Sequence, residues 1–264
     1  MKPTRAVITG ASSGIGEAFA RELATQRVNL VIAARRTEQL NKLARELEEN
    51  YQISVDVMTI DLEDPSAPEK LFKFATEKGN VDLLINNAGR GPYRHFLKTE
   101  LFDHEKVIQL NITSLTSLCH LFAGHMIEVG KKAAILNVAS VASFTPVPRY
   151  AVYCSTKSYV KAFSEILNYE LKDTCVSVSC LCPGGTRTEF LEKNNQKTKV
   201  GSEKLLMPVE KVAKAGLEGT LTGKPVIIPG LLNKLSSALP SILPNKVNMF
   251  VTEKAMNIAV EERD

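Results

Sequence analysis

Apolar runs of strand length alternate with longer amphipathic stretches along most of the chain. The runs are nearly continuous in Val, Ile, Leu and Ala, which is typical of parallel strands covered on both faces. Seven runs of this kind lie at 6–9, 30–33, 55–60, 83–86, 134–138, 176–181 and 226–228. Stretches with helical periodicity lie at 14–26, 38–50, 66–78, 100–129, 150–172 and 208–220. The alternation predicts a doubly wound α/β fold, with a seven-stranded parallel sheet between two layers of helices.

Two segments depart from this alternation. Residues 187–207 are polar and rich in Lys and Asn, and an excursion of this length between a strand and a helix is usually functional, so we interpret it as a substrate loop. Residues 230–264 form a leucine-rich, amphipathic C-terminal tail punctuated by Pro240 and Pro244. Packing onto the body, an oligomer contact, a lid over an apolar substrate and a membrane contact all stay open for this tail. Because no linker or repeat interrupts the chain, residues 1–264 are expected to form a single domain.

A glycine-rich turn joins the first strand to the first helix. Gly10 permits the tight turn, Gly14 lets the backbone approach a pyrophosphate, and Gly16 allows the helix to pack on the strand. The start of the helix then presents free N–H groups to the phosphates. The spacing GxxxGxG therefore predicts a dinucleotide site of the Rossmann type. Its expected cofactor contacts are Gly10, Ser12, Ser13, Gly14, Ile15 and Gly16.

The second strand ends in two arginines, Arg35 and Arg36. An NAD(H) site usually places a carboxylate here to bind the ribose 2′-hydroxyl, and the sequence has none. A guanidinium suits a 2′-phosphate instead. The doublet thus favours NADP(H) over NAD(H), the alternative being that both arginines simply cap a solvent-facing loop.

Tyr153 and Lys157 are four residues apart, a spacing that places both side chains on one face of a helix. A free tyrosine titrates near pH ~10, and a neighbouring ammonium favours the phenolate. Lowering the pKa by about three units needs roughly 4 kcal/mol. The lysine together with a cationic nicotinamide ring could supply this in a site with little water.

These features occur together with Asp61-Leu62, Asn86-Asn87-Ala88-Gly89, Asn111, Ser140 and Pro183-Gly184, all in order. Because all of these motifs are present, the chain resembles the short-chain dehydrogenase/reductase family in its single-domain branch. The resemblance covers residues 5–188 well and reaches the last strand more loosely. It implies that residues 1–264 are one Rossmann-type oxidoreductase domain.

The resemblance implies further roles for individual residues. Gly185 and Thr186 stand where relatives often carry bulkier apolar residues, so the contacts there are less defined. The implied cofactor contacts are Asp61 and Leu62 at the adenine, Asn87, Ala88 and Gly89 at its ribose, Tyr153 and Lys157 at the nicotinamide ribose, and Thr186 and Thr188 at the carboxamide, with Pro183 and Gly184 in the same segment.

Four residues are implied to be catalytic. Ser140 would bind the substrate oxygen, Tyr153 would exchange the proton, and Lys157 would lower the pKa of Tyr153. Asn111 would help to hold a water chain that leads to Lys157. The resemblance thus implies hydride transfer between NADP(H) and a carbonyl or secondary alcohol. We expect reduction of a hydrophobic ketone, a 3-oxoacyl compound or a steroid-like substrate.

The same residues bear on two other functions. A non-catalytic NADP(H)-binding redox sensor or scaffold would need a degraded active site, whereas all four catalytic residues are present. A sugar-nucleotide epimerase or dehydratase would share the Tyr–Lys pair but generally has a GxxGxxG turn and an added substrate domain, and this chain has neither. The substrate, the stereochemistry and the physiological direction stay open.

Composition narrows the partners and the location. The net charge is only +4, and no basic run is long enough to indicate a nucleic-acid surface. Neither a secretory signal nor a stretch of about 18 apolar residues is apparent, so no transmembrane segment is expected. The five cysteines have no disulfide framework spacing, which favours reduced thiols and a cytoplasmic location. The four histidines show no metal-ligand spacing, and no metal is expected. By analogy with relatives, we expect a homodimer or homotetramer.

Overall fold

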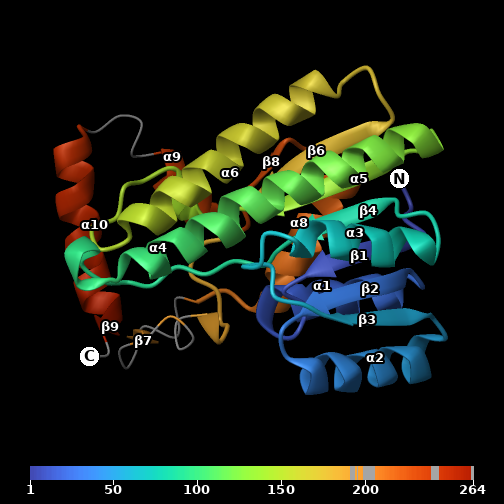
Figure 1. Cartoon of the computed structure of the whole chain (residues 1–264). Helices are drawn as coiled ribbons and strands as arrows, with labels where there is room; N and C mark the ends of the chain where they lie inside the picture. The colour runs from blue at the N-terminus through green and yellow to red at the C-terminus, as the bar shows by residue number, and fades with distance from the viewer. Residues whose placement is uncertain (191–193, 195, 199–205, 239–243, 263–264) are drawn as a thin grey trace.

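Seven parallel strands form one sheet in the order β3-β2-β1-β4-β5-β6-β8 (Figure 1). The computed structural model describes residues 1–190, 194, 196–198, 206–238 and 244–262. The strands are β1 (Arg5–Thr9), β2 (Asn29–Ala34), β3 (Val55–Thr59), β4 (Leu83–Asn86), β5 (Ala133–Val138), β6 (Val176–Leu181) and β8 (Val226–Ile227). All seven predicted strands are confirmed, with ends that differ by one residue at most. The strand order reverses between β1 and β4, and in a doubly wound sheet this is where a crevice opens at the carboxyl ends of the strands.

Helices cover both faces of the sheet. Neighbouring residues of one strand supply both faces, since Val7 and Ile8 are each fully buried but belong to different core clusters. Ile8 packs in the cluster that contains Phe19 of α1, and Val7 in the cluster that contains Phe122 of α5. The first layer holds α1 (Gly14–Thr25), α2 (Thr37–Tyr51) and α8 (Val209–Leu221), and the second holds α3 (Ala67–Glu77), α5 (Leu115–Val129) and α6 (Ala151–Glu170). The doubly wound prediction is confirmed.

The helix predicted over 100–129 is interrupted. It is divided into α4 (Leu101–Ile108), a π-helical segment η2 (Gln109–Ser114) and α5. Single π-helical turns are rare inside helices and are frequent at functional sites. Hydrophobic periodicity continues through such a turn, which is why the sequence predicted one continuous helix. The π segment contains Asn111, whose side chain is almost completely buried.

Among the described residues, the span Leu101–Val129 is the one helical stretch long and apolar enough to cross a membrane by length and composition. Core helices satisfy the same criterion, so this is weak evidence for a membrane span. Here the α5 part packs on the sheet and contributes Leu118 and Phe122 to the core. The expected absence of a transmembrane segment stays a prediction.

The C-terminal tail contributes two helices, α9 (Leu231–Ala238) and α10 (Asn245–Ala259). In Figure 1, α10, drawn in red, stands at the end of the molecule where α4 and α6 begin, and the N-terminus lies at the other end. Residues 196–198 and 260–262 pair as a short antiparallel ladder, β7 with β9, that the sequence did not predict. Part of the predicted substrate loop and the tail residues 239–243 and 263–264 lie outside the described residues.

Candidate active site

The glycine-rich turn between β1 and α1 needs glycine for two separate reasons. Gly10 and Gly14 have φ angles of +66° and +61°, a region that side chains disfavour. Gly16 has an ordinary backbone, but a Cβ atom there would overlap the Gly10 carbonyl oxygen and the Asn87 side chain. The turn therefore lies directly against the loop that follows β4.

Thr9 joins these two loops, a role that its place in the sequence does not indicate. Its buried hydroxyl accepts hydrogen bonds from the backbone N–H groups of Asn87 and Ala88, both at 3.0 Å. In return, Nδ2 of Asn87 donates to the Thr9 carbonyl at 2.9 Å. These bonds fix the segment Asn87–Gly89 beside the glycine turn, where the sequence predicted cofactor contacts.

The two arginines after β2 differ in their environment. Arg36 is held in place, because its guanidinium donates to Ser12 Oγ at 3.1 and 3.2 Å and to the Ser12 carbonyl at 3.0 Å. It also pairs with Glu189 at 3.2 Å. The Arg35 side chain is 62% exposed, and its Nη1 lies 3.7 Å from Asp61 and 3.5 Å from Glu63. Arg35 is therefore the more exposed of the two arginines, and its ion pairs are longer than those that hold Arg36.

Ser140 and Tyr153 meet at the carboxyl end of β5. Ser140 begins the short helix η3 (Val141–Ser143) and accepts a hydrogen bond from the Ala142 N–H at 3.1 Å. Ser140 also lies within interaction range of Tyr153, which is near the start of α6. Burial raises the pKa of Tyr153 above its ordinary value, and the polar side chain of Ser140 opposes part of this rise.

Lys157 lies one helical turn after Tyr153 and is 5% exposed. Its Nζ donates to the Val138 carbonyl at 2.7 Å and lies 5.8 Å from the centre of the Tyr153 ring. Burial lowers the pKa of Lys157 to about 8, with a small opposing effect of the Cys180 and Cys182 thiols behind it. The predicted lowering of the Tyr153 pKa by Lys157 is not found here, because burial dominates Tyr153 and the ammonium is directed at Val138. A lowered value in the complex with cofactor stays a prediction.

Asn111 lies behind this pair and does not reach the cavity surface. Its Nδ2 donates to Thr156 Oγ1 at 3.0 Å and to the Arg90 carbonyl at 2.9 Å, and its Oδ1 accepts from the Arg90 N–H at 3.1 Å. Asn111 thus ties the loop after β4 to the residue that precedes Lys157. The contacts place Asn111 as a brace within the site, and its partners Arg90 and Thr156 are not among the residues predicted from the sequence.

One cavity of about 940 Å³ connects these groups. It is lined by all the predicted site residues except Gly16, which lies beneath the glycine turn, and Asn111. It contains the glycine turn and the two arginines, and also Pro183, Gly184, Thr186 and Thr188. The site predicted from scattered motifs is therefore one continuous surface.

The far end of the cavity is apolar. Tyr153 lies there between two aromatic rings, with ring centres 5.1 Å from Tyr150 and 5.8 Å from Phe190. Most of the lining residues around Tyr153 are apolar or uncharged, although Arg90 and Glu189 also line the cavity; they include Val141, Ala142, Thr145, Val147, Tyr150, Phe190, Leu206, Asn248, Val251, Thr252 and Met256. Four of these residues come from α10, so the tail forms a wall of the cavity.

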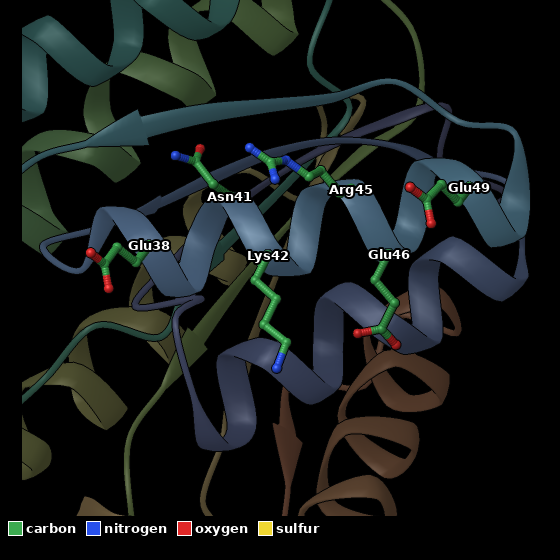
Figure 2. A pocket seen from close by; sticks show the side chains of 6 residues that line it. All are labelled: Glu38, Asn41, Lys42, Arg45, Glu46 and Glu49. Carbon is green, nitrogen blue, oxygen red and sulfur yellow. The ribbon is translucent and has the colours of Figure 1, made fainter.

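A second hollow, of about 470 Å³, lies on the outer surface of α2 (Figure 2). Lys42 and Glu46 point from it toward α1, where Glu46 pairs with Arg21 at 2.5 Å. Its lining consists of the polar side chains Glu38, Asn41, Lys42, Arg45, Glu46 and Glu49. Because every lining side chain is polar or charged and none is a buried base, we interpret this hollow as a solvated helix surface.

Metal chemistry has no candidate site in the part of the chain that the structure describes. There, no group of three or more His, Cys, Asp or Glu side chains could hold an ion. The five cysteines are free thiols, and Sγ of Cys180 lies 3.7 Å from Sγ of Cys182.

The fold and the cavity define a Rossmann-type oxidoreductase domain with a Ser–Tyr–Lys site. Over residues 4–199 the chain matches the family model described as short chain dehydrogenase, and it belongs to that family. Its members are oxidoreductases that act on CH–OH or C=O groups with a nicotinamide cofactor.

Several relatives and solved structures are similar over most of their length. The chain is 31% identical to 17-beta-hydroxysteroid dehydrogenase type 3 of Mus musculus, covering 89% of this chain and 77% of the relative. It is 29% identical to the very-long-chain 3-oxoacyl-CoA reductase of Bos taurus, covering 93% and 78%. A short-chain dehydrogenase from Sphingobium yanoikuyae in complex with NADPH has a TM-score of 0.81 at 30% identity, covering 91% and 96%. A relative from Burkholderia phymatum in complex with NAD has a TM-score of 0.81 at 25% identity, covering 89% and 92%.

Proposed function

We propose that this protein is an NADP(H)-dependent reductase of hydrophobic ketones or related carbonyl compounds. The observation that carries the proposal is the cavity itself. Ser140, Tyr153 and Lys157 lie between a dinucleotide-type turn at one end and an apolar chamber at the other. A cofactor bound along the first half would have its reactive end beside Tyr153, facing the chamber.

The residues present fit a dinucleotide with a 2′-phosphate. The backbone of the glycine turn and the start of α1 supply N–H groups for the pyrophosphate, and Gly10 and Gly14 line the cavity there. Arg35 and Arg36 line the cavity at the end of β2, where NAD(H) sites carry a carboxylate. These two positively charged side chains support the proposed preference for NADP(H).

In the reductive direction the bound cofactor supplies a hydride to the carbonyl carbon of the substrate. Negative charge then develops on the carbonyl oxygen, and the hydroxyls of Ser140 and Tyr153 are placed to stabilise it. Tyr153 donates its proton to that oxygen. A raised pKa keeps Tyr153 protonated at neutral pH, so in this structure it is ready to act as the acid.

Lys157 and Asn111 are proposed to support the proton transfer. A pKa near 8 lets the Lys157 ammonium lose and regain a proton close to neutral pH. Its contact with the Val138 carbonyl fixes the ammonium beside Tyr153, and Asn111 braces the adjacent Thr156. We propose that a proton lost from Tyr153 is replaced along this side of α6.

The chamber favours an uncharged, apolar substrate. Val147, Phe190, Val251 and Met256 offer apolar surface to the substrate beside Tyr153. The similarity to a hydroxysteroid dehydrogenase and to a long-chain 3-oxoacyl reductase supports the same choice. Steroid-like ketones and 3-oxoacyl thioesters with long chains are therefore the first substrates to test.

The test is a screen of NADPH oxidation over steroid, acyl and aromatic carbonyls, with NADH run beside it. Tyr153→Phe should lower turnover by about a hundredfold or more while NADPH still binds. Tyr169→Phe, on the exposed far end of the same helix, is the matched control and should retain full activity. NADPH binding without turnover on any carbonyl would instead favour the sensor or scaffold function. If neither cofactor binds, the proposal fails entirely.

A cytoplasmic location and a homo-oligomer are part of the proposal. Ile166 and Tyr169 on α6 are 59% and 69% exposed, and Ile127 on α5 is 41% exposed. Large exposed apolar side chains on neighbouring helices support an interface between copies of the chain.

A further inference from the structure

Glu63 is a buried carboxylate just after β3, two residues beyond Asp61. Its side chain is only 5% exposed. Three cations from three different segments surround it: Arg90 at 3.2 Å, Arg35 at 3.5 Å and Lys106 at 3.5 Å. Buried carboxylates are usually stable only when paired, and Glu63 has more partners than one charge requires.

The three cations differ in how freely they can leave. Arg90 is fixed, because its backbone N–H and carbonyl are both bonded to Asn111 and its guanidinium also lies 3.5 Å from Asp103. Arg35 has a mainly exposed side chain and lines the cavity, whereas Glu63 does not. If Arg35 turns toward a ligand, Glu63 keeps Arg90 and Lys106 and is not left as an isolated buried charge.

We propose that Glu63 is a specificity-determining residue that limits the preference for a 2′-phosphate on the cofactor. The inference rests on the proposed function, in which Arg35 binds that phosphate. Glu63 and the phosphate compete for one guanidinium, so the pairing of Arg35 with Glu63 opposes the pairing of Arg35 with the phosphate. A cofactor with a free 2′-hydroxyl does not need Arg35, so its binding is independent of this competition.

The test replaces Glu63 with its neutral isostere and compares the two cofactors. Glu63→Gln should strengthen NADPH binding by about three- to tenfold, which is the effect of one nearby charge at the protein surface, and leave NADH binding unchanged. Dissociation constants for NADPH and NADH are measured by fluorescence titration. Asp64→Asn is the matched control, because Asp64 is the next residue, carries the same charge and is paired with Lys70 at the surface.

A double-mutant cycle with Arg35→Ala isolates the proposed contact. Without Arg35, Glu63→Gln should change NADPH affinity no more than NADH affinity. If Glu63→Gln fails to fold, Glu63→Asp withdraws the carboxylate by one methylene and should give a smaller shift in the same direction. Unchanged unfolding midpoints show that the variants are intact.

Three outcomes would overturn the inference. The first is an unchanged ratio of NADPH to NADH affinity, which would make Glu63 only a brace for Arg90. The second is weaker NADPH binding. The third is an equal shift in Asp64→Asn, which would indicate a general charge effect. Failure of the wild-type protein to bind either cofactor would contradict the proposed function itself, so the two failures are distinguishable.

Discussion

Lys157 and Val138 are joined by a hydrogen bond of 2.7 Å from the lysine ammonium to the backbone carbonyl. Val138 is the last residue of β5 and lies two residues before Ser140. The lysine of α6 and the serine are thus both positioned by the same strand end. This arrangement orients the ammonium, but burial makes the charged form costly.

The free-energy cost of burying the Lys157 ammonium predicts an unusual dependence of stability on pH. The pKa of Lys157 is about 8 in the folded protein, against about 10.4 for an unfolded chain. Between these values the unfolded chain binds a proton that the folded protein does not, so this group makes stability rise with pH. Below pH 8 the full cost applies. Lys157→Met should therefore increase the free energy of unfolding at pH 7 by up to about 3 kcal/mol.

The measurement is urea unfolding of both proteins at several pH values between 7 and 10. The thiols of Cys154 and Cys119 change the free energy of unfolding in the opposite direction. Burial raises the pKa of Cys154 to about 11 and that of Cys119 to about 12, so their stabilising contribution is lost as pH rises. They are common to both proteins, so the difference isolates the lysine. A difference that does not shrink as pH rises above 8 contradicts the prediction.

Arg35 is predicted to distinguish the two cofactors. Arg35→Ala should raise the KM for NADPH by about 10- to 100-fold, the value of one or two hydrogen bonds to a charged group, and leave the KM for NADH nearly unchanged. Steady-state kinetics with both cofactors and one carbonyl substrate provide the measurement. Arg45→Ala removes an arginine from the solvated face of α2 and should affect neither KM. Equal effects of Arg35→Ala on both cofactors would remove the assignment of Arg35 to the 2′-phosphate.

Gly16 is predicted to tolerate no side chain. In Gly16→Ala the new methyl group would overlap the Gly10 carbonyl and the Asn87 amide, so the turn must move. We expect a loss of about 1–3 kcal/mol in stability, together with weaker NADPH binding. Gly124→Ala is the control, because a Cβ there meets nothing within 4 Å and the helix interior gains about 1 kcal/mol. Thermal unfolding and fluorescence titration would show the contrast, and equal behaviour of the two variants would contradict it.

The parts of the fold with a strong local signal could be predicted from the sequence. Strands such as 30–33 are apolar at every position, because helices cover both faces of the sheet. Their assignment as buried strands is therefore clear from the sequence. The glycine turn was equally readable, since Gly10 and Gly14 satisfy a backbone requirement that few other residues meet. The family resemblance then gathered distant positions such as Ser140 and Tyr153 into one site, and the structure brings these two together.

The remaining features depend on contacts between distant segments. Glu63 appears in the sequence as one more charged loop residue, and only the fold places Arg90 and Lys106 around it. Thr9 has no signal of its own beyond its place in the turn. The π segment at Asn111 is invisible to periodicity, because one widened turn hardly changes the spacing of the apolar residues. The direction in which the pKa of Tyr153 is shifted also depends on burial, which cannot be predicted from a short motif.

Because α10 forms one wall of the cavity, residues that shape the cavity and residues of the Ser–Tyr–Lys group lie in different parts of the chain. The turn, the strand ends and the Ser–Tyr–Lys group all precede residue 190, whereas Val251, Thr252 and Met256 come from the last helix. Chimeras that exchange the tail between relatives would thus alter which carbonyl fits while leaving the reacting groups untouched. Substrate selectivity could therefore be redesigned by exchanging the segment that contains α10.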